Sequence, residues 1–125
     1  MNLLLDTHAL LWWVTDDPQI SRVARDALGD PQSFVFFSAA SIWEIETKVN
    51  LGKLTAPADW LEKVEASHLE PLDISVYHAR DAGKLPLHHR DPFDRMLVAQ
   101  AITEGLTIVT RDRRIEAYDV ATLRA

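Results

Sequence analysis

The sequence predicts an α/β protein, a three-layer α/β/α sandwich with a central, mainly parallel sheet. Three short and mostly apolar runs, at residues 1–5, 34–37 and 106–110, are typical of strands buried on both faces. Segments with helical periodicity separate these runs, and parallel strands require such crossovers between them. Alternation of this kind favours helices on both faces of one sheet.

The first third of the chain is expected to hold one strand and two helices. Residues 1–5 form the strand, and a helix over 7–14 ends at the turn formers of residues 16–18. A second helix spans 21–28, because a serine at its start can cap it and Gly29 can end it.

The middle of the chain adds two strands and two helices. Aromatic and β-branched residues at 34–37 indicate a strand, and a helix over 38–50 or 41–50 follows it. The next helix is expected over 55–66, because the proline near its start is tolerated in a first turn. Residues 69–72 are expected to form a short strand.

The last third carries the most regular helical pattern. A helix over 75–85 starts at a serine cap, and the helix over 91–104 has proline at its second position and glycine directly after its end. A buried strand at 106–110, a helical turn at 113–117 and an edge strand at 120–123 complete the predicted domain.

Length and composition bound the class of protein. The 125 residues suffice for one domain, residues 1–125, and 47% hydrophobic content can fill its core. The chain has no cysteine, which excludes disulfides, thiolate zinc sites and a cysteine nucleophile. The longest early apolar stretch, residues 9–14, is too short to span a bilayer, and no basic segment precedes it. We therefore expect a cytoplasmic protein without a membrane segment.

Four carboxylates are placed so that this fold would bring them together. Asp6 directly follows the first strand, and Asp112 follows the third apolar run. Glu44 lies in the helix after the second strand, and Asp94 in the first turn of the last long helix. Ligands bind in the crevice outside the carboxyl ends of parallel strands. Clustered carboxylates are unfavourable unless a proton or a cation compensates them, so the pattern predicts a divalent metal site.

The same acids also have structural explanations. Asp6 is a good N-cap, Asp112 could stabilise a turn, and Glu44 has capping-box spacing from Ser41. Asp91, followed by proline, is favourable as an N-cap near the positive end of the helix dipole.

We divide the roles of the two acids at the start of the last long helix. Asp91 is predicted to cap the helix, and Asp94, one turn in, is predicted to reach the metal. Thr110, at the end of its strand, could orient an acid or a bound water.

The net charge of −6 argues against a general polyanion binder, because nonspecific affinity for nucleic acid comes largely from lysine and arginine. Five arginines nevertheless lie within three residues of Asp91, Asp94 or Asp112, namely Arg90, Arg95, Arg111, Arg113 and Arg114. They place positive charge around the acidic centre, or they are solvated charges at helix ends.

Four segments, spread over nearly the whole chain, carry a resemblance to a known family. They are residues 3–8 (LLLDTH), 38–44 (SAASIWE), 89–95 (HRDPFDR) and 109–112 (VTRD). Together they resemble the PIN domain family, and within it the VapC toxins of prokaryotic toxin–antitoxin pairs. The resemblance implies a PIN-like α/β/α sandwich, a Mg²⁺- or Mn²⁺-dependent ribonuclease and a proteinaceous antitoxin that blocks the site.

The resemblance also implies roles for individual residues. The acids of the site would be Asp6, Glu44, Asp94 and Asp112. Asp6 and Asp94 would hold one metal directly, and the other two would hold it through water or help to place a second ion. Asp91 would be a cap or an additional ligand.

Contacts to RNA and to protein partners are also expected. Candidates for binding RNA are Arg90, Arg95, Arg111 and Arg113, with His8, His88 and His89. Trp12 and Trp13 point about 100° apart on a helix, so an apolar patch there could receive an antitoxin helix or a second copy of the chain in a homodimer. Trp43 is expected to pack in the core.

A PIN-like module that binds RNA or protein without cutting is the alternative. A degenerate member would be expected to lose one or more of Asp6, Glu44 and Asp94, and this chain has all three. Nucleotide-binding enzymes are disfavoured because the chain has no glycine-rich phosphate loop.

Overall fold

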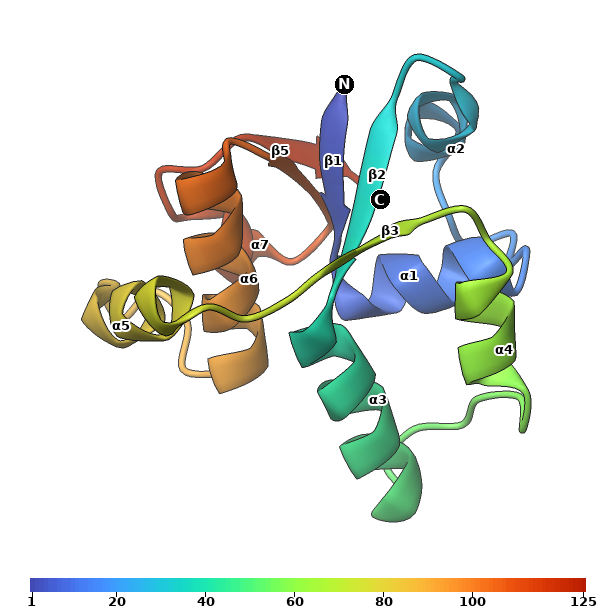
Figure 1. Ribbon diagram of the computed structural model, residues 1–125, viewed down its shortest axis with the longest axis horizontal. Coiled ribbons are helices and arrows are strands. Elements are labelled where there is room, and N and C mark those ends of the chain that lie inside the picture. The colour runs from blue at the N-terminus through green and yellow to red at the C-terminus, as the bar shows by residue number, and fades with distance from the viewer.

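The computed structural model describes all 125 residues and contains one five-stranded sheet (Figure 1). The strand order is β3-β2-β1-β4-β5, and every neighbouring pair is parallel. The strands are β1 (Asn2–Leu5), β2 (Phe34–Ser38), β3 (Glu70–Leu72), β4 (Thr107–Thr110) and β5 (Thr122–Arg124). The predicted α/β architecture is confirmed, and the sheet is parallel throughout.

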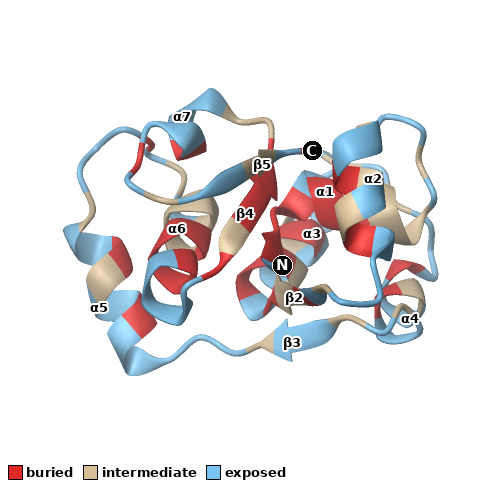
Figure 2. Ribbon diagram, turned by 90° about the horizontal axis from the view of Figure 1, so that it is seen from above, coloured by how far each residue is buried: buried red, intermediate tan, exposed pale blue.

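Helices cover both faces of this sheet, as Figure 2 shows, with α5, α6 and α7 on one side and α1, α2 and α4 on the other. The helices are α1 (Thr7–Val14), α2 (Arg22–Gly29), α3 (Ala39–Asn50), α4 (Trp60–Glu65), α5 (Val76–Lys84), α6 (Pro92–Glu104) and α7 (Arg113–Glu116). None of them combines the length and the apolar character that crossing a membrane requires.

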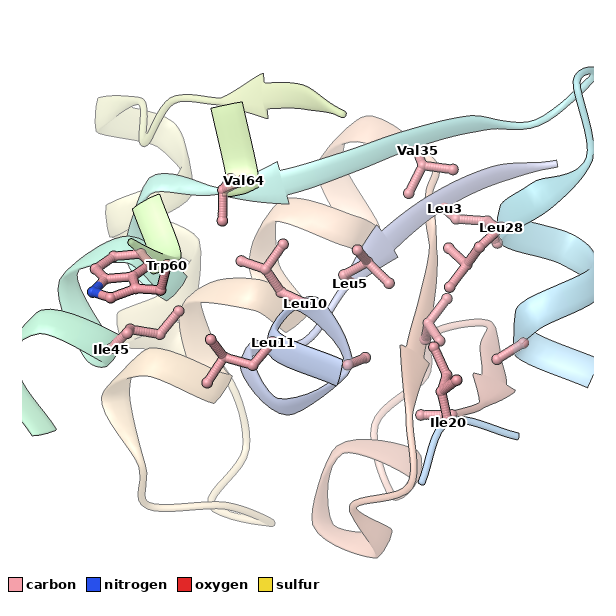
Figure 3. Close-up of a cluster of buried hydrophobic side chains, with 14 residues drawn as sticks. Leu3, Leu5, Leu10, Leu11, Ile20, Leu28, Val35, Ile45, Trp60 and Val64 are labelled. Carbon is pink, nitrogen blue, oxygen red and sulfur yellow. The ribbon is translucent and has the colours of Figure 1, made fainter. Parts of the chain in front are cut away.

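The core has two parts because side chains alternate between the faces of a strand. Leu3 and Leu5 of β1 belong to the cluster under α1, α2 and α4, where Leu10 of α1 packs beside them (Figure 3). Leu4 points to the opposite face and packs with Leu97 of α6. Burial on both faces explains why β1 has no polar residue after its first position.

Helix α3 begins at the earlier of its two predicted starts, and helix α4 begins later than predicted. Ser38 is the N-cap of α3, and its hydroxyl accepts a hydrogen bond from Ala40 N at 3.0 Å and donates one to Gln100 Oε1 at 2.6 Å. Ser41 is therefore inside the helix, which excludes the alternative explanation of Glu44 as part of a capping box with Ser41. Helix α4 begins at Trp60, because the residues after the proline form a turn first.

The topology places one crevice beside β1. The chain runs from β1 outward to β2 and β3, and then returns to β4 on the other side of β1. The carboxyl ends of β1 and β4 are adjacent, since the Asp6 N–H donates to the carbonyl of Val109 at 3.1 Å. Adjacent strands whose chains continue in opposite directions leave a ligand-binding crevice at this point.

Candidate active site

A polar pocket of about 400 Å³ lies at the carboxyl ends of the central strands. Its carboxylates come from segments far apart in the sequence: Asp6 after β1, Glu44 on α3, Asp91 and Asp94 at the start of α6, and Asp112 after β4. The structure therefore brings together all four acids that the sequence singled out, with Asp91 beside them.

Three of these carboxylates cap a helix and line the pocket at the same time. Asp6 accepts a hydrogen bond at 2.8 Å from the backbone N–H three residues on, and Asp112 accepts one at 2.8 Å from the N–H two residues on. Asp91 caps α6, as predicted, through its Oδ1 atom, which accepts from two backbone N–H groups at 2.8 and 3.1 Å. Structural and functional explanations are therefore compatible, because each cap uses one of two carboxylate oxygens.

Glu44 is held from two sides. The hydroxyl of Thr7 donates to its Oε1 atom at 2.5 Å, and the ammonium of Lys48 donates to its Oε2 atom. The hydrogen bond to Glu44 raises the pKa of Lys48, and the charges of Asp91 and Asp94 add to this effect. The sequence analysis missed Lys48, although its spacing four residues after Glu44 places both side chains on one face of α3.

The environment of Asp94 shifts its pKa strongly. Its side chain is only 17% exposed. Burial raises its pKa to about 8, and the neighbouring charges of Asp91, Glu44, Asp6 and Asp112 contribute to the shift. Without a bound cation, Asp94 therefore carries a proton at neutral pH.

Asp6 and Asp112 are linked through Thr110. Burial raises the pKa of Asp6, while hydrogen bonds from the Thr110 hydroxyl and from its own helix cap oppose the shift. The same Thr110 oxygen accepts a hydrogen bond from Asp112 N at 3.0 Å. Thr110 is fully buried, so its hydroxyl has a fixed position between the two acids.

His89 lies within the acidic cluster and is not available at the surface. Its side chain is 5% exposed, and its Nε2 atom lies 3.1 Å from Asp112 Oδ2 and 2.9 Å from Asp94 Oδ2. One ligand atom from each of these three residues falls within 4.8 Å of the others, a spacing compatible with a metal ion. The sequence had suggested only a contact of His89 with RNA.

The predicted arginines have different environments. Arg95 does not reach the pocket, because its guanidinium donates to four main-chain oxygens between residues 82 and 89 at 2.9 to 3.2 Å. The expectation that Arg95 contacts RNA is therefore replaced by a structural role in the loop before α6. Arg90 is exposed and does not line the pocket.

Arg111 and Arg114 line the pocket, whereas Arg113 does not. The guanidinium of Arg111 donates to the main-chain oxygen of Ala125 and lies 4.4 Å from the ring of Trp12. The side chain of Arg114 is exposed at the mouth of the pocket. Among the arginines near Asp112, Arg114 is therefore the one best placed to meet an incoming phosphate.

Trp43 is not in the core, and this prediction is wrong. Ser41, Glu44 and Ile45 form the buried face of α3. Trp43 precedes Glu44 and points about 100° away from it, which leaves the indole 63% exposed. The ring packs edge-on against Phe93 of α6, at the border of an apolar groove of about 220 Å³ between α3, α5 and α6.

The donor set fits a hard divalent cation. Carboxylate oxygens dominate the pocket, and no sulfur-containing side chain lines it. Burial is the main cause of the raised pKa values of Asp6 and Asp94, and neighbouring carboxylate charges add to both shifts, so a bound cation would favour the ionised forms. Asp6, Glu44, Asp94 and Asp112 therefore have suitable chemistry for metal ligands and line one pocket, in which ligand atoms of Asp94 and Asp112 lie within 4.8 Å of each other and of His89.

Comparison with known proteins gives the family. Residues 3–121 match the family described as PIN domain. The chain is 30% identical over 121 residues to Ribonuclease VapC22 of Mycobacterium tuberculosis, an alignment that covers 94% of this chain and 92% of that protein.

Solved structures share the fold. VapBC2 from Rickettsia felis, bound to a promoter DNA fragment, superposes with a TM-score of 0.73 at 18% identity over 98% of each chain. DNA-bound VapBC from Salmonella typhimurium gives a TM-score of 0.71 at 24% identity, over 98% of this chain and 97% of the other. By sequence match and by fold, the chain belongs to the PIN domain family and, within it, to the VapC-type ribonucleases.

Proposed function

We propose that the chain is a metal-dependent endoribonuclease and the toxin of a VapBC-type toxin–antitoxin pair. The observation that carries this proposal is the convergence of Asp6, Glu44, Asp94 and Asp112 on one pocket in a chain 30% identical to a VapC ribonuclease. The proposal takes residues 1–125 as one domain acting in the cytoplasm, with RNA as substrate and a cognate antitoxin as protein partner.

These four carboxylates would hold Mg²⁺ or Mn²⁺, with Asp91 close enough to assist. The bound cation would supply activated water and would neutralise charge on the scissile phosphate. The chain itself orients the ligands: Thr7 and Lys48 fix Glu44, and helix caps fix Asp6 and Asp112.

The deciding experiment is cleavage of labelled transfer and ribosomal RNA by antitoxin-free protein, with Mg²⁺ or Mn²⁺ and with EDTA. We expect cuts only with metal, and products that end in 5′-phosphate and 3′-hydroxyl groups. Cyclic 2′,3′-phosphate ends would contradict attack by water. Absence of metal binding would favour the noncatalytic alternative, whereas metal binding without cleavage would point to a wrong RNA substrate or a residual inhibitor.

RNA affinity is expected to depend on Arg114. Arg114→Gln should weaken binding of RNA and reduce the slope of log affinity against log salt by about one unit, because one phosphate contact is lost. Arg113→Gln is the matched control, since Arg113 is exposed on the same helix but lies outside the pocket. Equal salt slopes for the two variants would exclude a phosphate contact by Arg114.

The apolar groove between α3, α5 and α6 favours a homodimer. Trp43 and Val76 expose 63% and 82% of their surface, and Ile74 and Met96 line the groove nearby. Exposed apolar surface of this kind is typical of an interface, and a second copy bound here would lie beside Glu44 and Asp94. Sedimentation velocity should show a dimer that Trp43→Ser weakens, and a wild-type monomer at all concentrations would refute this part of the proposal.

A further inference from the structure

We infer that His89 is a positioning residue of the acidic pocket, whose Nε2–H group holds Asp94 and Asp112 together for metal binding. The inference rests on the proposed function, since it assigns His89 a role toward the cation held by these acids. It concerns orientation of the ligands and does not make His89 a ligand itself.

The contacts of the ring join two separate parts of the fold. Asp94 belongs to the first turn of α6, whereas Asp112 belongs to the segment between β4 and α7. His89 Nε2 makes a hydrogen bond with Asp112 Oδ2 at 3.1 Å and lies 2.9 Å from Asp94 Oδ2. The oxygens of both side chains therefore face one ring nitrogen, which fixes their orientation relative to each other.

The other ring nitrogen determines where the proton lies. The backbone N–H of Asp91 donates to His89 Nδ1 at 3.3 Å, so Nδ1 is an acceptor. In a neutral imidazole the remaining nitrogen then carries the hydrogen. Nε2 consequently offers an N–H donor to Asp112, with Asp94 Oδ2 2.9 Å away, and not a lone pair to a metal.

The loop that carries His89 is itself rigidly held. The main-chain N–H of His89 donates to the Tyr118 hydroxyl at 3.1 Å, and the His89 carbonyl accepts from Arg95 at 3.2 Å. Tyr118 also donates to the carbonyl of Pro86 at 2.6 Å, while Arg95 binds further carbonyls of the same loop. The hydrogen bonds of Arg95 and Tyr118 therefore hold the imidazole ring of His89 in place relative to Asp94 and Asp112.

A donor that orients metal ligands changes affinity without touching the ion. Loss of such an outer partner typically lowers metal affinity or activity 10- to 100-fold. Without His89, the side chains of Asp94 and Asp112 would lose the group that orients them toward a shared cation. We therefore expect substitution of His89 to weaken metal binding as well as to slow RNA cleavage.

The first test is Mn²⁺ affinity by titration calorimetry for the wild type, His89→Leu and His89→Gln. His89→Leu should bind Mn²⁺ roughly 10- to 100-fold more weakly, whereas the amide N–H of His89→Gln should retain most of the affinity. His88→Leu is the matched control, because His88 stacks against Tyr118 outside the acidic pocket. Circular dichroism of each variant verifies folding.

The second test needs no substitution. In ¹⁵N-labelled wild-type protein, long-range ¹H–¹⁵N spectra should show His89 with Nε2 protonated both before and after Mg²⁺ is added. Loss of the Nε2 proton on Mg²⁺ binding would make His89 a ligand and would overturn the inference. Wild-type Mn²⁺ affinity in His89→Leu would also overturn it, whereas no Mn²⁺ binding by the wild type would overturn the proposed function itself.

Discussion

Asp94→Asn is expected to lower RNA cleavage on the order of a thousandfold, while the metal-free protein remains at least as stable as the wild type. The amide keeps the shape of the side chain but removes the charge that a cation would bind. Asp94 is also largely buried beside other carboxylates, and its pKa is raised to about 8. Loss of activity and retention of stability should therefore occur in the same variant.

Loss of cleavage together with retained stability distinguishes a role of Asp94 in catalysis from a folding defect of the variant. Cleavage rates at saturating Mg²⁺ and urea denaturation in EDTA would be measured on the same preparations. Asp26→Asn provides the control, because the Asp26 side chain is 75% exposed on α2 and lies far from the pocket in the fold. If Asp94→Asn retained near wild-type cleavage, Asp94 would not be a metal ligand.

The metal-free protein is expected to lose stability as the pH rises from 5 to 8. The folded-state pKa of Asp94, about 8, lies above its ordinary value of 3.8, so the folded chain binds this proton more tightly than the unfolded chain. The contribution to stability is complete below the ordinary pKa and is lost as the pH rises through the folded value. We expect a change of a few kcal/mol between these limits.

Urea denaturation in EDTA at several pH values would measure this dependence. The slope of unfolding free energy against pH should be shallower for Asp94→Asn, because the variant has no proton to release at this position. Mg²⁺ should restore stability at pH 8, since a ligand that binds only the folded state stabilises it. Parallel pH profiles for the wild type and Asp94→Asn in EDTA would show that Asp94 is not the group responsible.

Local signals in the sequence were enough to predict the strands and most helices. Serine and aspartate caps, the glycine at the end of α6 and the apolar runs of β1 and β4 act within a few residues, so they can be recognised without the rest of the chain. The same applies to the convergence of Asp6 and Asp112. Both follow parallel strands, and parallel strands end at one edge of a sheet.

Properties that depend on packing between distant segments could not be predicted in this way. The hydrogen bond from the Ser38 hydroxyl to Gln100 joins residues 62 positions apart. The exposure of Trp43 depends on which face of α3 meets the core. The hydrogen bonds of Arg95 to main-chain carbonyls depend on the path of the loop before α6.

The sequence by itself determined which acids the chain brings to the carboxyl edge of its sheet, because strand ends and helix starts are set by local propensity and apolar pattern. Only the tertiary structure decided what surrounds those acids. Lys48 against Glu44, and His89 between Asp94 and Asp112, arise from the relative placement of α3, α6 and the segment after β4. That placement is fixed by burial of side chains on both faces of the sheet, and no local sequence pattern encodes it.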